Sequence, residues 1–434
     1  MRRPGLPFWT VEHTALYYHC RQLSRFDGVH LMACRICKAQ TSSVLDLGES
    51  PPANSFSGAP TDEQESFPLI LESCASCGNL QLHDCVDAEL LYRNYLYTTP
   101  DSELLRAHYK ILCGYLAAGE YVRPESFVLE IGSNSGLFLR YLKPRVGKVL
   151  GVDPAANVCA IARGGGIDTL CDFFAAPAAK AIRASYGVPD VIIARHCFAH
   201  NCDPHVMIAA AAQLLADGGA LVIENAYALN TIENNEFDQI YHEHMFYFSI
   251  RSMQTLLGLH GLYIADILMS PVHGGSIVFV ARRGNIRAHK STLIEQHLQE
   301  EKLRLNTAAL ERFRDSAVRI RARLAALVRE LNGAGKSIYT YGASAKGNTL
   351  LNYVGLTSAD IRCCVDSTPI KQGKFLPQSK IAVVSEEYAR SAPPDYFLLT
   401  AWNYKEEIIA KVRAAGNERS NFIVPIPEVR VVDA

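Results

Sequence analysis

The sequence predicts an α/β protein with three parts: a small N-terminal zinc-binding domain, a central doubly wound sheet and a C-terminal Rossmann-like α/β domain. Two Cys-x-x-Cys pairs stand near the N-terminus. Strand-sized apolar runs then alternate with helical segments, as in a parallel sheet covered by helices. A second alternation of this kind follows Gly335. The chain has 434 residues, more than a single core usually holds, so several domains are expected.

The composition excludes several classes of protein. The chain carries 43 basic and 44 acidic side chains, so it lacks the excess of positive charge that nucleic-acid binders and polybasic membrane proteins need. Its apolar runs are too short to span a membrane, and Glu12 and His13 interrupt the only stretch that resembles a signal peptide. We therefore expect a cytoplasmic protein, a monomer or weak homo-oligomer, with a small-molecule substrate and no nucleic-acid or membrane partner.

The predicted division of the chain follows these changes in pattern. In chain order we expect an N-terminal extension (1–31), a zinc-binding domain (32–95), a central domain (96–286), a connecting helix (287–332) and a C-terminal domain (333–434).

The first predicted site is a structural zinc centre. Cys34, Cys37, Cys74 and Cys77 form two metal knuckles, and four thiolates complete a closed tetrahedral Zn²⁺ site. The alternative is two unrelated pairs of buried thiols. The remaining cysteines, with Cys85 the nearest, are expected to be free thiols, because a protein that is not exported seldom forms disulfides.

The central domain begins with a helix over about residues 102–118. Four buried parallel strands are expected after it, at residues 126–132, 148–153, 190–194 and 219–224.

A cofactor site is predicted at the glycine turn that ends the first of these strands. Gly132 and Gly136 allow a tight turn before a helix N-terminus, and Asp153 ends the next strand, where an acid can accept hydrogen bonds from a ribose. The turn lacks the complete G-x-G-x-x-G pattern that binds a pyrophosphate, which favours S-adenosylmethionine (SAM) over NAD. A turn that binds nothing is the alternative. The expected cofactor residues are Glu130, Gly132, Asn134, Gly136, Asp153, Asp172 and Phe173, the last two meeting the adenine.

The third signal is the run Tyr-His-Glu-His from Tyr241 to His244. It follows a strand that ends at Glu224 and Asn225, and ligands of doubly wound sheets bind at that edge. A histidine here is a natural general base, while a phenol or His200 can stabilise a developing oxyanion. A catalytic zinc is disfavoured, because His242 and His244 are not at the HExxH spacing. The remaining alternative is a polar turn without function.

The last third of the chain begins with an amphipathic pattern over about residues 287–331, which we interpret as one connecting helix and not a coiled coil. Strands are then predicted at 337–341, 361–366 and 395–400. The turn after the first of them misses the dinucleotide fingerprint, which makes an oxidoreductase the weaker reading. Its Lys346 and Asn348 instead suit phosphate or sugar contacts.

These motifs together resemble the NDP-sugar C-methyltransferases of deoxysugar biosynthesis, which place a branching methyl group on C3 of a 4-keto sugar nucleotide. The resemblance runs from Met32 to the C-terminus. It rests on the two cysteine pairs, Glu130-Ile-Gly-Ser-Asn, Phe198-Ala-His, Tyr241-His-Glu-His, His273-Gly-Gly, Tyr341-Gly-Ala-Ser-Ala-Lys-Gly-Asn-Thr and Ala401-Trp-Asn403.

The resemblance implies that His244 is the base, with Tyr241, Glu243 and His200 as its companions. It also implies a class I SAM-methyltransferase domain in the centre and a nucleotide sugar held with help from the C-terminal domain. The expected substrate contacts are Asn225, His273, Lys346, Asn348 and Asn403. An O- or N-methyltransferase on the same scaffold and a non-catalytic sugar-nucleotide-binding protein remain as alternatives.

Two positions depart from the family pattern. Ser135 stands where the family often has aspartate. The stretch from Arg195 to Cys197 is unusually polar, so His196 competes with His200 as the functional histidine.

Overall fold

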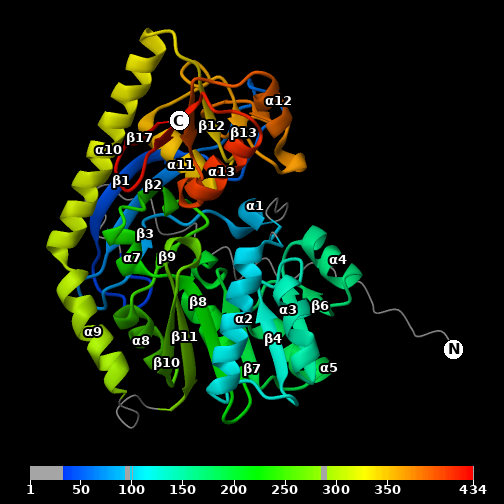
Figure 1. Cartoon of the computed structure of the whole chain (residues 1–434). Helices are drawn as coiled ribbons and strands as arrows, with labels where there is room; N and C mark the ends of the chain where they lie inside the picture. Colours follow the sequence, from blue (N-terminus) through cyan, green and yellow to red (C-terminus); the bar gives the residue numbers. More distant parts are fainter. Residues whose placement is uncertain (1–32, 93–97, 100, 285–290, 434) are drawn as a thin grey trace.

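The computed structural model describes residues 33–92, 98–99, 101–284 and 291–433. The predicted extension 1–31 lies outside the described residues, as do the proposed domain ends at 95 and 286. The chain forms two large α/β bodies with a smaller sheet between them, and a long pair of helices runs along one side (Figure 1). Among the described residues, no helix combines the length and the apolar character that crossing a membrane requires.

The N-terminal sheet has four antiparallel strands in the order β1-β2-β3-β9. They are β1 (Ser42–Ser50), β2 (Phe67–Ser73), β3 (Leu80–Leu82) and β9 (Phe246–Tyr247), and helix α1 (Ala88–Tyr92) follows β3. The last strand belongs by sequence to the central part of the chain, so the N-terminal sheet is completed by a segment that lies more than 160 residues further on.

The central sheet has seven strands in the order β10-β11-β8-β7-β4-β5-β6. Its strands are β4 (Phe127–Ile131), β5 (Lys148–Asp153), β6 (Thr169–Cys171), β7 (Val191–Arg195), β8 (Ala220–Ala226), β10 (Leu262–Ser270) and β11 (Ser276–Arg283). Five neighbouring strands, in the order β8-β7-β4-β5-β6, are parallel to one another. Strand β11 runs antiparallel to both of its neighbours, β8 and β10. The four predicted strands are confirmed as β4, β5, β7 and β8.

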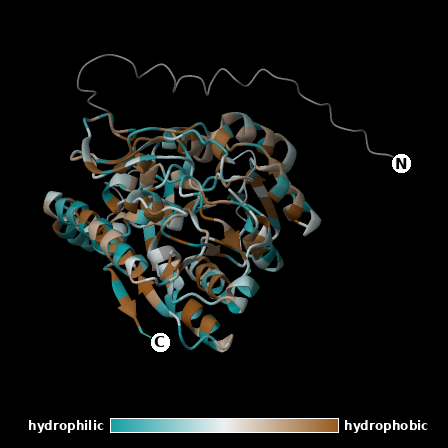
Figure 2. Cartoon of the chain, turned by 90° about the horizontal axis from the view of Figure 1, so that it is seen from above, coloured by the Kyte–Doolittle hydropathy of each residue, from teal (hydrophilic) through white to brown (hydrophobic). Residues whose placement is uncertain are grey.

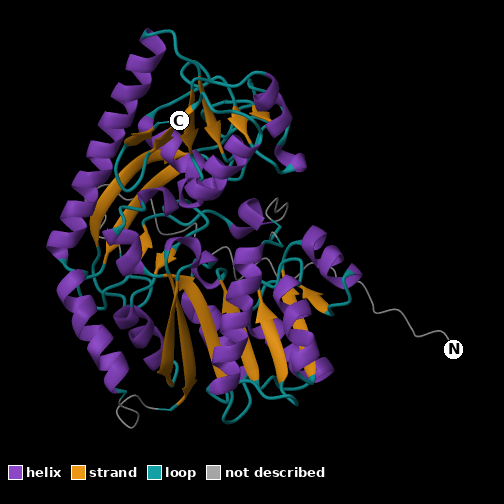
Figure 3. Cartoon of the chain, viewed as in Figure 1, coloured by secondary structure: helices purple, strands orange, loops and turns teal. Residues whose placement is uncertain are grey.

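Helices cover both faces of this sheet (Figure 3). They are α2 (Glu103–Ala118), α3 (Leu137–Leu142), α4 (Ala156–Gly164), α5 (Ala176–Tyr186), α6 (Pro204–Leu214), α7 (Ala228–Glu233) and α8 (Ile250–Gly258). The predicted first helix is confirmed as α2, which begins after Ser102 because that side chain caps the amide of Leu105. Figure 2 shows the strands as largely hydrophobic and the helices as mixed, as expected for a sheet buried between amphipathic helices.

The C-terminal sheet has six strands in the order β14-β13-β12-β15-β16-β17. Its strands are β12 (Ile338–Tyr341), β13 (Cys364–Val365), β14 (Val383–Val384), β15 (Tyr396–Leu399), β16 (Asn421–Val424) and β17 (Arg430–Val432), with helices α11 (Ala345–Val354), α12 (Glu386–Ser391) and α13 (Lys405–Ala414). Its first five strands repeat the order of β6-β5-β4-β7-β8, and β17 is antiparallel to β16. The predicted Rossmann-like domain is therefore confirmed.

The prediction of a single connecting helix is wrong. The structure has two helices there, α9 (Thr292–Arg304) and α10 (Thr307–Gly333), and the predicted start at 287 lies outside the described residues. The break falls at Asn306, whose extended backbone and side-chain hydrogen bond to the amide of Ala309 start the second helix. Helix α10 packs against α7, α11 and β1, so it connects all three parts of the molecule.

The expectation that every cysteine outside the zinc centre is a free thiol is also wrong. Cys85 and Cys202 form a disulfide, with Cα atoms 5.9 Å apart. The bond joins the segment between β3 and α1 to the segment that follows His200, so it links the N-terminal and central parts of the chain.

We expect this disulfide in the air-purified protein. After denaturation without reductant, Cys85 and Cys202 should resist alkylation among the cysteines that the structure describes, and adding a reductant should expose both. Peptide mass spectrometry identifies the pair. In a Cys202→Ser control, Cys85 should be alkylated without reductant, whereas its alkylation in the unreduced parent protein would contradict the pairing.

Candidate active site and zinc centre

The four predicted metal ligands converge on one point. The Sγ atoms of Cys34, Cys37, Cys74 and Cys77 all lie within 4.8 Å of one another. The closest pairs are 3.6 Å for Cys34 and Cys77 and 3.5 Å for Cys37 and Cys74. A tetrahedral zinc with Zn–S bonds of about 2.3 Å separates its sulfurs by about 3.8 Å, so the cluster fits the ion. Four thiolates close the coordination shell, which gives the zinc a structural role.

Both knuckles are built by the same backbone turn. The amides of Lys38 and Gly78 donate to the carbonyls of Cys34 and Cys74 over 2.9 and 2.8 Å. Both donors have positive φ angles, 64° and 73°. The turn thus folds each knuckle so that its two sulfurs face the other knuckle.

The knuckles also dock onto the central domain. His205 of α6 lies 3.0 Å from the carbonyl oxygen of Ile36, and Arg251 of α8 donates to the carbonyl of Ala75 over 3.1 Å. The metal therefore orders the surface that joins the zinc-binding domain to the central sheet.

The cofactor turn after β4 has the predicted conformation. Gly132, Asn134 and Gly136 all have positive φ angles, and the amide of Gly132 donates to the carbonyl of Val152 on β5 over 2.8 Å. A Cβ atom on Gly132 would lie 2.5 Å from that of Cys197, so only glycine fits. This turn leads into α3, and its amides are held by hydrogen bonds to β5 and within the turn.

Asp153 braces this turn. Its carboxylate accepts hydrogen bonds from the amides of Asn134 and Ala155 over 2.9 and 3.0 Å, and burial raises its pKa. The Asn134 side chain in turn accepts from the amide of Thr99 over 3.0 Å. Asp153 therefore holds the turn in shape, and its contact with a ribose stays a prediction.

Glu130 of β4 is paired with an arginine of β7. It is 1% exposed and pairs with Arg195 over 3.0 Å. Burial raises its pKa to about 7 against the opposing effect of that arginine. The structure thus gives Glu130 a partner within the sheet, and a direct contact with the cofactor stays a prediction.

Asp172 and Phe173 line a cavity of about 300 Å³ at the carboxyl ends of β5 and β6. Tyr92 of α1 and Pro154 complete two of its walls. The cavity adjoins Asp153, because the amide of Asp172 donates to the carbonyl of Asp153 over 3.1 Å. This is where the predicted adenine contacts would place the base.

The contacts of His244 fix the position of its proton within the histidine cluster, which consists of His200, Tyr241 and His244. His244 Nδ1 lies 3.0 Å from the carbonyl oxygen of Gln239, and Nε2 lies 2.7 Å from the hydroxyl of Tyr241. Because a carbonyl only accepts, Nδ1 carries the proton and Nε2 accepts from Tyr241. Burial holds the pKa of His244 well below its usual range, with a further contribution from His200. His244 is therefore a neutral imidazole, and Nε2 is its acceptor nitrogen.

His200 lies beside this imidazole. The centres of the two rings are 5.2 Å apart, and the ring of Tyr92 stacks on His200 with a distance of 5.8 Å between centres. Burial, aided by His196, lowers the pKa of His200 to about 4, so it is neutral as well. The cluster thus brings together His200, Tyr241 and His244 as predicted, and it adds Tyr92 and Gln239, which no sequence motif marked.

The other two residues of the motif face the zinc-binding domain. Glu243 is 2% exposed and accepts a hydrogen bond from Asn54 over 2.6 Å. It lines a second cavity, of about 390 Å³, together with Phe56 and Lys374. His242 lies 3.2 Å from the carbonyl oxygen of Phe67, so it fastens the motif to β2.

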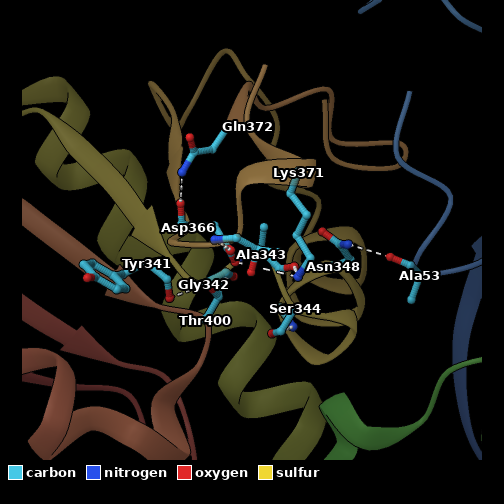
Figure 4. Close-up of polar contacts among 12 residues, drawn as sticks. Ala53, Tyr341, Gly342, Ala343, Ser344, Asn348, Asp366, Lys371, Gln372 and Thr400 are labelled. Atoms are coloured by element: carbon cyan, nitrogen blue, oxygen red, sulfur yellow. Dashed lines mark hydrogen bonds and ion pairs between the residues drawn. The ribbon is translucent and has the colours of Figure 1, made fainter. Parts of the chain in front are cut away.

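The predicted substrate residues have different surroundings. Asn225 is 2% exposed, and neither amide atom has a hydrogen-bond partner among the described residues. Asn348 donates to the carbonyl of Ala53 over 2.6 Å, so its amide nitrogen already joins α11 to the zinc-binding domain (Figure 4). Asn403 is half-buried in the turn Trp402–Tyr404. The side chain of His273 lies outside the described residues.

The first turn of the C-terminal domain has the bonding of the cofactor turn. The amide of Gly342 donates to the carbonyl of Val365, and the amide of Ala343 donates to the carboxylate of Asp366, each over 2.8 Å. Figure 4 shows Lys371 reaching the same point, where its ammonium donates to the carbonyl of Ala343 over 2.7 Å. The acid and the lysine thus bind this turn from the side of β13.

A parallel sheet in the order 3-2-1-4-5 with an antiparallel strand inserted beside its last member, a glycine turn and an acid at the end of the second strand define a class I SAM-dependent methyltransferase. The chain matches three family models in order: a zinc-binding domain over residues 34–92, a methyltransferase domain over 106–267 and a C-methyltransferase C-terminal domain over 271–427.

Over 407 residues the chain is 35% identical to the C-methyltransferase NovU of Streptomyces niveus, with 92% of this chain and 97% of that protein covered. The chain therefore belongs to the C-methyltransferases. It is a SAM-dependent enzyme with a zinc-binding domain, which confirms the predicted class of enzyme and both cofactors.

Two solved structures are similar over part of the chain. The N-methyltransferase NodS of Bradyrhizobium japonicum is 15% identical, with 43% of this chain and 99% of that chain covered at a TM-score of 0.33. The magnesium protoporphyrin IX methyltransferase ChlM of Synechocystis PCC 6803 is 17% identical, with 42% and 84% covered at a TM-score of 0.33.

Loss of one zinc ligand should remove the metal. Cys74→Ser is expected to bind less than one tenth of an equivalent of zinc by elemental analysis. Because zinc binding is coupled to folding, we expect a loss of about 2 kcal/mol or more and a Tm lower by at least about 4 °C. The exposed Cys171→Ser should keep the full zinc content. Full zinc in the Cys74 variant would contradict the assignment.

A methyl group at the cofactor turn should weaken SAM binding. Gly132→Ala combines a positive φ with the clash at Cys197, so we expect a Kd for SAM at least about tenfold higher, or about 1.4 kcal/mol. Isothermal titration calorimetry measures it. Gly114→Ala on α2, where a Cβ meets nothing within 4 Å, is the matched control. Equal affinities of the two variants would contradict the site.

Proposed function

We propose that the enzyme methylates the carbon beside the ketone of an NDP-4-keto-deoxy sugar, at C3, in the biosynthesis of a branched deoxysugar. The observation that carries the proposal is the neutral His244, whose Nδ1 donates to the carbonyl of Gln239 and whose Nε2 accepts from the Tyr241 hydroxyl. A carbon acid beside a ketone needs such a base, whereas SAM supplies the electrophilic methyl group.

Each residue of the histidine cluster has its own role in the proposed reaction. A ketone that binds beside Tyr241 accepts a hydrogen bond from its hydroxyl group, which releases Nε2 of His244. This nitrogen then removes the proton from the carbon next to the ketone. The resulting enolate places its charge on the ketone oxygen, which Tyr241 and His200 stabilise. Glu243, held by Asn54, orients the motif from the side of the zinc-binding domain.

The nucleotide part of the substrate is assigned to the space between the zinc-binding and C-terminal domains. Support comes from the cavity of about 390 Å³ that Phe56, Glu243 and Lys374 share, because it begins at the catalytic motif and ends at a C-terminal lysine. Two domains around one cleft hold a large ligand at the near-attack distance that methyl transfer needs.

O- or N-methylation of the same class of substrate is the second candidate, since it uses the same base on a hydroxyl or amine. Incubation in D₂O without SAM separates the two: C-methylation predicts deuterium at the carbon beside the ketone, and O- or N-methylation predicts none.

His244→Ala should lower turnover of a dTDP-4-keto-6-deoxy sugar by about 10²–10⁴-fold, because the general base is lost. SAM affinity should stay within about twofold, since the cofactor turn does not contact this side chain. The product mass and NMR position of the methyl group report turnover. His297→Ala on α9 is the control and should retain activity. Near-normal turnover of the His244 variant would overturn the base assignment.

The pH profile tests the same residue. The active form is the neutral imidazole, and burial depresses its pKa. The rate should therefore stay on its plateau from pH 8 down to about the ordinary histidine value of 6.5 and fall only below it. A fall centred above about pH 7 would contradict a buried, neutral His244.

A further inference from the structure

Lys346 is the second residue of α11, and its ammonium is buried at the contact between the C-terminal and central domains. The side chain is 16% exposed, and the Nζ atom lies 3.9 Å from Glu236 Oε2 and 5.7 Å from the ring centre of Trp402. Nζ has no hydrogen-bond partner among the described residues. A buried ammonium with three unused N–H groups is costly, which indicates that it serves a ligand.

One short turn contacts both the helix that carries Lys346 and the proposed base, His244. Helix α11 packs on the turn Phe237–Gln239. The carbonyl of Gln239 holds His244 Nδ1, and Asp238 accepts a hydrogen bond from the indole of Trp402 over 2.6 Å. The charge of Lys346 also contributes to the lowered pKa of His244, so the two groups share one electrostatic environment.

Among the described residues, the positive charge that the central domain brings to the histidine cluster is that of His196, which is titratable and adds to the lowering of the pKa of His200 and of His244. His200 and His244 are neutral, and the Tyr241 hydroxyl is a neutral donor. An enolate that forms among neutral donors in a buried site is poorly stabilised, because low-dielectric surroundings penalise an isolated negative charge. The reaction proposed above therefore needs a cation, and Lys346 carries one to the same turn.

We propose that Lys346 is a catalytic residue whose ammonium stabilises the enolate oxygen. The inference rests on the proposed function and deepens it. When the C–H bond breaks, the proton passes to His244 Nε2, the electron pair forms the C=C bond, and the carbonyl π pair moves to oxygen. Lys346 keeps its protons and donates a hydrogen bond to that oxygen. Glu236, whose pKa burial raises to about 7, holds the ammonium until substrate arrives.

The alternative is that Lys346 only neutralises the buried acids Glu236 and Asp238. The two roles predict different results for substitutions. A structural ion pair can be replaced by two neutral groups of similar size, whereas a catalytic charge cannot.

The test is deuterium exchange in D₂O with a dTDP-4-keto-6-deoxy sugar and S-adenosylhomocysteine, read by NMR and mass spectrometry, together with kcat and KM for methylation. We expect Lys346→Met to lower the exchange rate and kcat by about 10²–10³-fold with a KM within about threefold. Lys346→Arg keeps the charge, so its exchange rate and kcat should be at least about tenfold higher than those of Lys346→Met.

Two controls separate catalysis from folding. Lys405→Met, an exposed lysine of the same domain, should behave as the parent enzyme. The Lys346 variants should keep the parent Kd for SAM in a calorimetric titration, which shows that the central domain is folded.

The decisive variant is Lys346→Met combined with Glu236→Gln. If this double variant stays as slow as Lys346→Met, the catalytic role is supported. If it regains the parent rate, Lys346 is a structural counter-ion and the inference is overturned, although the proposed function stands. If the parent enzyme exchanges no hydrogen, the proposed function is wrong and the inference is wrong with it.

Discussion

The backbone pairing of β9 with β3 is the constraint on which the site depends. Leu82 of β3 donates to the carbonyl of Met245 over 3.0 Å, and the amide of Met245 donates to the carbonyl of Ala199 over 2.9 Å. Met245, the residue that follows His244, is thus fixed between the sheet of the zinc-binding domain and the turn that contains His200. His244 cannot shift without disturbing these backbone bonds, which explains how two histidines from distant segments keep their ring centres 5.2 Å apart.

The zinc gives this pairing its rigidity. Strand β3 begins three residues after Cys77, and a sheet of this size has too small a core to be stable alone. The closed thiolate centre orders both knuckles, and their contacts with His205 and Arg251 hold the sheet against the central domain. A zinc ion bound by these four thiolates would therefore support the position of His244 through a chain of backbone hydrogen bonds.

Local pattern was enough to predict much of the fold. The strands, the capped helix at Ser102, the glycine turn and the cysteine centre each follow from residues close in sequence. The predictions that failed depend on distant contacts. Nothing near Phe246 reveals that it pairs with Gln81, and the apolar pattern of the connecting helix continues through Asn306, where a cap interrupts it. Tyr92 joins the site only through the packing of α1.

The C-terminal domain repeats the topology and turn bonding of the central domain, but it presents different chemistry to the cleft. Asp366 and Lys371 fill the turn from the β13 side, so its backbone is committed to internal contacts. Its helix α11 instead reaches outward, with Asn348 on the zinc-binding domain and Lys346 near Glu236.

Lys346 and His244 come from different domains but share one electrostatic environment. Burial holds the pKa of His244 well below its usual range, and the charge of Lys346 adds to that effect. The ammonium of Lys346 lies on a second domain, and its helix packs on the turn that ends at Gln239, whose carbonyl holds His244 Nδ1. The two groups can then favour the same proton transfer, one by accepting the proton and the other by stabilising the charge it leaves behind.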